Sequence, residues 1–169
     1  EHVLLHLAGW RQAREILRRY DDMAGGAGHL PLAGALHRLA GRLRSALADP
    51  RLAGKCRVVA IHHPPAGKRA ASSIRGLKDR ADFAAVIKEC GADVVIHGHE
   101  HRNMRESLDG PAGPIDVLGV PSGTYEANDA TRTARYRIFE IEAGRVVGQH
   151  LRIWHRDRKT FARDEHEPS

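Results

Sequence analysis

The chain has 169 residues, of which 41% are hydrophobic and 28% charged, and its formal net charge is +6. This length suits one globular domain, and the composition excludes a chain that is disordered throughout. No apolar run approaches the roughly 18 residues that span a bilayer, and residues 1–7 lack the basic start of a secretory signal. The two cysteines, Cys56 and Cys90, form no metal-binding pair and are expected to be free thiols. We therefore expect a cytoplasmic protein with no membrane partner.

The first thirty residues are interpreted as a segment of their own. Residues 11–20 predict a short basic helix, and Gly25, Gly26 and Gly28 predict a flexible loop after it. Arginines support one hypothesis, a basic nucleic-acid binder that uses the arginine-rich end of the chain together with Arg11, Arg14, Arg18 and Arg19. Aromatic residues make up only 5% of the chain, too few for a base-stacking surface. Nucleic acid is therefore not the expected partner.

An amphipathic helix is predicted next. Pro31 suits a first helical turn and Pro50 stops the pattern. Between them leucines recur at helical spacing, at Leu32, Leu36, Leu39, Leu43 and Leu47. Such a face packs against another element of the fold.

Two apolar runs with a helical pattern between them predict a strand, a helix and a second strand. The runs are residues 57–61 and 94–96. Asp79 can cap the intervening helix and Gly91 can end it, and its apolar face consists of Phe83, Val86, Ile87 and Cys90. Strands joined in this way run parallel through a right-handed crossover. Their carboxyl ends therefore reach the same edge of the sheet.

The remaining sequence is mostly β. Residues 115–120 predict a strand, and residues 136–141 and 146–154 predict a hairpin around Ala143 and Gly144. Residues 158–169 are charged and expected to be frayed. We see no second complete domain. The predicted organisation is an N-terminal segment over 1–30, a main unit over 31–156 and a charged tail over 157–169.

Histidines cluster at the ends of both predicted parallel strands. His62 and His63 follow the first strand, and His97, His99 and His101 follow the second. Open α/β sheets bind ligands at this edge, and neutral imidazole is a good ligand for first-row metals. We therefore predict a metal site formed by His62, His99 and His101.

These two segments resemble the last two motifs of calcineurin-like metallophosphoesterases. The run Val-Val-Ala-Ile-His-His-Pro-Pro at 58–65 is similar to a family strand that ends in His, often in His-His-Pro. The run Val-Ile-His-Gly-His-Glu-His at 95–101 is similar to the final Gly-His-x-His motif. The resemblance extends over residues 32–154. It implies an α/β fold, here part of an αββα sandwich in which a βαβ unit precedes a β-rich C-terminal sheet.

The resemblance also implies roles for the histidines. His62 and His99 would bind one metal ion, and His101 would complete the other centre. His63 would not bind a metal directly, and both His63 and His97 would lie beside the ligands. Asn103, just past the second motif, receives no role.

The activity that the resemblance implies is hydrolysis of a phosphomonoester, a phosphodiester or a cyclic nucleotide. The cofactors would be two divalent ions, Mn, Fe or Zn, which clamp the phosphate and lower the pKa of a bridging water. The partner would be a small phosphoester. The cationic loop at 66–78 either steers this anion or is simply solvated.

Three earlier motifs of the family, Asp-x-His, Gly-Asp and Gly-Asn-His, do not occur before His62. They supply carboxylates, and neutral imidazoles alone leave two dications unneutralised. Because the chain also opens on Glu1 rather than Met, we interpret it as the C-terminal half of a metallophosphoesterase that is inactive or weakly active alone. The alternative is an inactive remnant or pseudoenzyme that binds only a metal or a partner. Half a sandwich exposes apolar sheet, so a homo-oligomer is a further possibility.

Overall fold

The computed structural model describes residues 3–6, 32–72 and 76–164, and it describes residues 3–6 and 32–39 by their backbone. The predicted helix at 11–20, the glycine-rich loop and the four N-terminal arginines of the nucleic-acid hypothesis lie outside these residues. Among the helices that are described, none has the length and apolar character needed to cross a membrane.

A five-stranded mixed sheet is the centre of the structure. In chain order its strands are β1 (Val3–His6), β2 (Arg57–Ile61), β3 (Val94–His97), β4 (Met104–Gly110) and β5 (Gly113–Gly119). Their spatial order is β1-β2-β3-β5-β4. The first four in this order run parallel, and β4 pairs antiparallel with β5. The sheet therefore ends in β1 on one side and β4 on the other, and no other described strand pairs with the outer side of β1.

The predicted strand–helix–strand unit is confirmed. β2 and β3 are parallel neighbours, with Ile61 opposite His97, and α4 (Arg80–Cys90) lies between them in the chain. Asp79 is the N-cap residue, although its side chain makes no capping hydrogen bond. Gly91 ends the helix with a φ of 73°, a left-handed value that favours glycine. The two strand ends that precede the histidines therefore lie next to each other.

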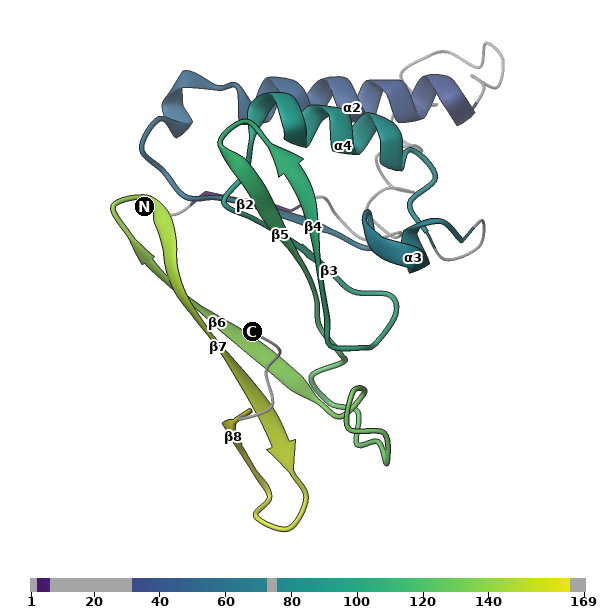
Figure 1. The fold of residues 1–169 in the computed structure, drawn as a ribbon, viewed down its shortest axis with the longest axis vertical. Helices are drawn as coiled ribbons and strands as arrows, with labels where there is room; N and C mark the ends of the chain where they lie inside the picture. The colour runs from purple at the N-terminus through teal and green to yellow at the C-terminus, as the bar shows by residue number, and fades with distance from the viewer. Residues whose placement is uncertain (1–2, 7–31, 73–75, 165–169) are drawn as a thin grey trace, which may run out of the picture.

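Two helices cover one face of the mixed sheet. α2 (Leu32–Leu47) and α4 lie side by side over it (Figure 1). The predicted leucine face of α2 is confirmed at Leu43 and Leu47, which are buried, and the helix ends before Pro50. Side chains from both helices and the sheet form one core, which includes Leu43, Leu47, Val59, Phe83, Val86, Ile87, Val95 and Val117. This core fixes β2 and β3, so the loops that leave them start from an ordered backbone.

A second sheet consists of three antiparallel strands, β6 (Arg135–Glu142), β7 (Arg145–His155) and β8 (Thr160–Arg163). Figure 1 shows it on the side of the mixed sheet away from α2 and α4. The predicted hairpin is confirmed, with Ala143 and Gly144 as its two-residue turn. Their φ values are 47° and 77°, positive at both positions as a type I′ turn requires.

The C-terminal tail is more ordered than we predicted. The expectation of fraying is wrong for residues 160–164, because β8 pairs with β7 and Asp164 is buried. Arg135 Nε donates a hydrogen bond of 2.7 Å to Asp164 Oδ2, and both side chains are only 6% exposed. A buried ion pair thus ties the tail to the start of β6.

The α/β class is confirmed as a mixed sheet with covering helices and a separate antiparallel sheet. The remaining described helices are short, η1 (Pro50–Leu52) and α3 (Gly67–Ala70). A second helical layer, as an αββα sandwich would have, is not among the described elements.

Candidate metal centre

Two loops bring histidines to one edge of the mixed sheet. His62 and His63 follow β2 directly, and Gly98 and His99 follow β3. Because β2 and β3 are parallel neighbours, the two loops begin side by side. The Gly98 N–H donates to the His62 carbonyl at 3.2 Å. The apolar strands therefore set the position of the loops, and the loops carry the polar side chains.

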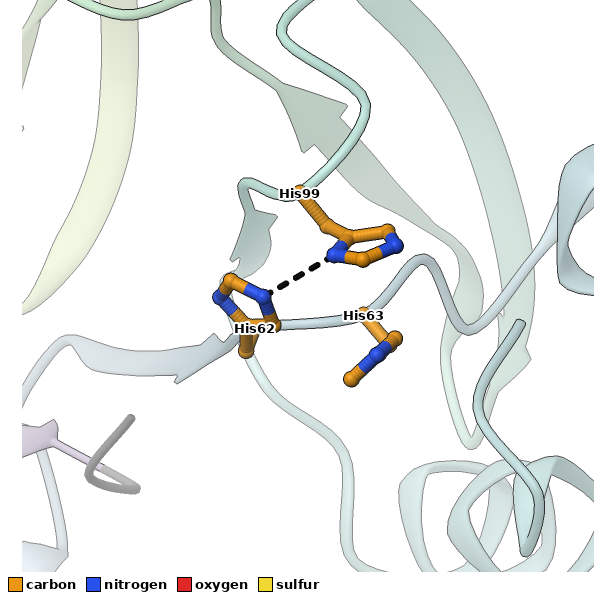
Figure 2. A group of neighbouring side chains, drawn as sticks. All are labelled: His62, His63 and His99. Carbon is orange, nitrogen blue, oxygen red and sulfur yellow. Dashed lines mark hydrogen bonds between the residues drawn. The ribbon is translucent and has the colours of Figure 1, made fainter. Parts of the chain in front are cut away.

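Three imidazoles meet at this edge. One ring nitrogen from each of His62, His63 and His99 lies within 4.8 Å of the others. His99 Nδ1 and His62 Nε2 are 3.0 Å apart and share a hydrogen bond. Figure 2 shows His99 reaching from its own loop toward the other two residues. We call these three residues the histidine group.

The histidine group contains two of the three ligands predicted from the sequence. His62 and His99 belong to it, whereas His101 is exposed and lies outside it. His101 is still close enough to His62 for its charge to lower the pKa of that imidazole. His63, which the resemblance implied was not a ligand, is the third member of the group. The feature of the sequence that could have indicated His63 as a ligand is its position directly after the strand end and before Pro64.

His97 lies behind the histidine group, at the end of β3, and is only 5% exposed. Its Nδ1–H donates to the Gly98 carbonyl at 3.1 Å, and Nε2 has no hydrogen-bond partner within the described residues. A Cβ atom on Gly119 would lie 2.8 Å from Cε1 of this ring, so that glycine makes room for it. Asn103 makes other contacts: its backbone N–H donates to the Thr131 carbonyl at 2.9 Å, and its side-chain Oδ1 accepts a hydrogen bond of 3.3 Å from Arg137.

The loop after β3 holds two non-glycine residues in the left-handed region, with φ of 65° at His99 and 50° at His101. Each such residue costs about 1–2 kcal/mol, and it persists only where the surrounding structure holds it. Glu100 lies between the two, and its buried carboxylate accepts a hydrogen bond from Arg69 of α3. The strained loop is therefore anchored at its middle residue.

The surroundings favour the neutral form of two imidazoles in the histidine group, those of His62 and His63. Burial lowers the pKa of His62, and the nearby His99 and His101 lower it further. Burial is also the main cause that lowers the pKa of His63, with additional effects from His99, His62 and Lys78. Only the neutral ring has a lone pair for a metal. Both histidines are therefore in the ligand form at neutral pH.

The donor set of the histidine group could hold one divalent cation. On a tetrahedral Zn ion, with Zn–N bonds of about 2.0 Å, two imidazole nitrogens lie about 3.3 Å apart. The separation of 3.0 Å between His62 and His99 is close to that value, and the 4.8 Å limit of the group would need a contraction of about 1.5 Å. No described carboxylate joins the group, so it does not match the charge that two bridged dications need.

Neither a scan against protein-family models nor a search of curated proteins found a match for this chain. The residues and geometry of the histidine group are therefore the basis on which a function can be proposed.

Proposed function

We propose that this chain takes part in the metal-dependent hydrolysis of phosphoesters and that the histidine group holds one divalent cation of the metal centre. The observation that carries this proposal is the meeting of His62, His63 and His99 at the ends of two neighbouring parallel strands. Ligands of α/β sheets bind at this edge. The resemblance of residues 58–65 and 95–101 to two metallophosphoesterase motifs supports the same chemistry.

The proposed contribution of the chain is to hold neutral imidazoles at fixed positions. Val59 and Val95, both fully buried, fix the strands from which the two ligand loops start. A divalent cation bound there would supply Lewis-acid polarisation of a phosphate oxygen and lower the pKa of a nearby water. Imidazole ligands suit Zn and Fe, whereas Mn prefers oxygen ligands such as carboxylates. Zn is therefore the first choice for the group alone.

A cationic side chain beside the group supports an anionic substrate. Lys78 is close enough to His63 to lower the pKa of that imidazole. Positive charge at the mouth of a site raises the local concentration of anions. The substrate class we propose is therefore a small phosphoester.

The absence of a carboxylate from the described histidine group limits what the group can do by itself. We propose that a two-metal centre containing Mn, Fe or Zn takes its carboxylates from outside the described residues. The chain alone should then hydrolyse a phosphoester slowly or not at all. The same all-imidazole donor set supports a second candidate, a metal-binding module without turnover.

Calorimetric titration with Zn²⁺ or Co²⁺ tests the metal site. We expect one cation per chain, and we expect affinity to fall more than about 10-fold in His62→Ala and in His99→Ala. His155→Ala is the matched control, because it removes an imidazole from β7 in the separate sheet. An equal loss in the control, or no binding by the unaltered chain, would overturn the site.

Two further measurements separate the hydrolase from the simple metal-binding module. Inorganic phosphate should bind the Zn²⁺-loaded chain and not the metal-free chain, and failure to do so would favour the module. With Mn²⁺ added, we expect little or no hydrolysis of bis(4-nitrophenyl) phosphate. Robust turnover that His99→Ala abolishes would support the hydrolase and show that no further carboxylates are needed.

A further inference from the structure

An ion pair joins the two loops that carry the histidine group. Arg69 lies in α3, on the segment that follows His62 and His63. Glu100 lies on the other segment, directly after His99. Arg69 Nη1 donates to Glu100 Oε2 at 2.6 Å. Arg69 is therefore near His62 and His63 in the chain, and Glu100 is next to His99.

The two partners of this pair are buried to different degrees. The side chain of Glu100 is 1% exposed and that of Arg69 is 41% exposed. A buried carboxylate is stable only with a charged or hydrogen-bonding partner. Arg69, which α3 presents to this carboxylate, therefore helps to keep Glu100 in its inward position.

α3 is itself held in place from two sides. Gly67, with a φ of 77°, begins the helix against Glu106, and a Cβ atom there would lie 2.2 Å from a carboxylate oxygen of Glu106. At the other end Ala70 is buried, and Arg80 Nη1 donates to its carbonyl at 3.0 Å. These contacts make α3 a defined support for Arg69.

Glu100 stands between the two left-handed residues of the loop, His99 and His101. Within the loop, the Glu100 N–H donates to the Gly98 carbonyl at 2.8 Å, a local contact that does not connect the loop to the other histidine segment. The buried carboxylate connects the loop to that segment through Arg69, in addition to the hydrogen bond from the Gly98 N–H to the His62 carbonyl. With Glu100 turned inward, its neighbour His99 is directed toward His62 and His63 at the sheet edge.

We propose that the Arg69–Glu100 ion pair positions the metal site by fastening the loop after β3 to α3, which keeps His99 against His62 and His63. This inference rests on the proposed metal site and adds that two residues which bind no cation determine its affinity. Glu100 acts through its neighbour, because its carboxylate lies outside the histidine group. Groups that orient metal ligands typically change affinity about 10- to 100-fold when they are removed.

Titration of Arg69→Ala, Arg69→Lys and Glu100→Gln with Zn²⁺ tests this role. We expect the Kd to rise about 10- to 100-fold in Arg69→Ala and Glu100→Gln. Arg69→Lys should recover part of the affinity, because lysine keeps the charge without the planar donor fork. The visible absorption of bound Co²⁺ should change in Arg69→Ala, since the coordination geometry depends on the placement of His99. If Arg69→Ala does not fold, the two conservative variants still provide the comparison.

The other buried arginine–carboxylate pair provides the matched control. Arg135→Ala breaks its pairing with Asp164 in the three-stranded sheet, and it should lower the Tm without changing the Kd for Zn²⁺. Unaltered affinity in Arg69→Ala and Glu100→Gln would overturn the positioning role and leave the proposed function standing. A similar loss of affinity in Arg135→Ala would assign the effect to general instability and also overturn it. No binding by the unaltered chain would overturn the proposed function itself.

Discussion

Among the described turns that hold non-glycine residues in the left-handed region, the β6–β7 hairpin and the loop after β3 are stabilised in different ways. In the β6–β7 hairpin, Ala143 at φ 47° is followed by Gly144, and strand pairing resumes at once between Glu142 and Arg145. In the loop after β3, His99 and His101 are both left-handed, and the loop is held by the ion pair of Glu100 with Arg69.

The difference lies in what the strain accomplishes. A two-residue hairpin needs positive φ so that its strands can pair, and the strand hydrogen bonds offset the cost. The histidine loop connects strands that do not pair with each other directly, because β5 lies between β3 and β4. Strain at such a loop is typical of functional sites. In this loop the two left-handed residues are both histidines, and one of them, His99, belongs to the histidine group.

The largest expected effect on stability is a difference between two ion pairs, Arg135–Asp164 in the second sheet and Arg69–Glu100 beside the histidine group. Arg135→Ala leaves the carboxylate of Asp164 buried beside the second sheet, and such a loss costs about 3–5 kcal/mol in the free energy of unfolding. Arg69→Ala should cost clearly less, because Arg69 is 41% exposed and water can approach the site. Urea denaturation of both variants measures the difference. Equal losses would show that the two pairs serve stability alike.

A smaller effect is expected when one left-handed residue in each of the two turns is replaced by asparagine. Asparagine tolerates the left-handed region better than alanine, whereas histidine is itself enriched there. Ala143→Asn should therefore raise the free energy of unfolding by about 0.5–1 kcal/mol, and His101→Asn should raise it by less. Thermal denaturation of each variant provides the measurement. A loss of stability in His101→Asn would mean that this side chain makes contacts which offset its backbone strain.

The same His101→Asn variant tests the ligand assignment. If the histidine group alone holds the cation, the Kd for Zn²⁺ should stay within about 3-fold of the unaltered chain, which corresponds to less than 1 kcal/mol. A rise of more than 10-fold would instead support the resemblance, which implies that His101 is a ligand. Ala143→Asn is the control, because its turn belongs to the second sheet.

The smallest expected effect concerns the helix between the two histidine strands. Burial raises the pKa of Asp79 above its ordinary value of 3.8. The folded state then binds a proton more tightly than the unfolded state, so stability falls as pH rises from about 4 through the raised pKa. Asp79→Asn should therefore stabilise the chain at pH 7 by less than about 1 kcal/mol, and the gain should disappear below pH 4. A gain that is constant from pH 3 to pH 7 would contradict this explanation.

The sequence predicted those helices and strands in which buried apolar residues recur at a clear spacing or form a continuous run. Val58 and Val59 in β2, Phe83 in α4 and the β6–β7 hairpin all follow from apolar spacing and turn residues. β4 and β8 were not predicted. Met104–Gly110 exposes alternate side chains, Thr160–Arg163 exposes its first and last side chains, and both strands contain few apolar residues. Their pairing partners, β5 and β7, supply the order that their own sequences do not indicate.

The candidate site was predictable to the level of the sheet edge and no further. Parallel strands ending in histidines predicted that His62 and His99 would meet, and they do. Whether His63 or His101 is the third member of the group depends on the directions of side chains in loops. Loops have no regular repeat from which these directions could be predicted. The left-handed backbone at His101 and the burial of Glu100 decide that direction, and neither can be deduced from local spacing.

The position of β1 at the margin of the mixed sheet has a consequence for assembly. Val3–His6 runs parallel to β2, and its outer side faces no described strand. A strand at the margin of a sheet is a place where one more strand can join by β-sheet augmentation. A strand that joined β1 in parallel would carry its carboxyl end to the same margin of the sheet as His62, and residues just beyond that end would stand on the side where the histidine group lies.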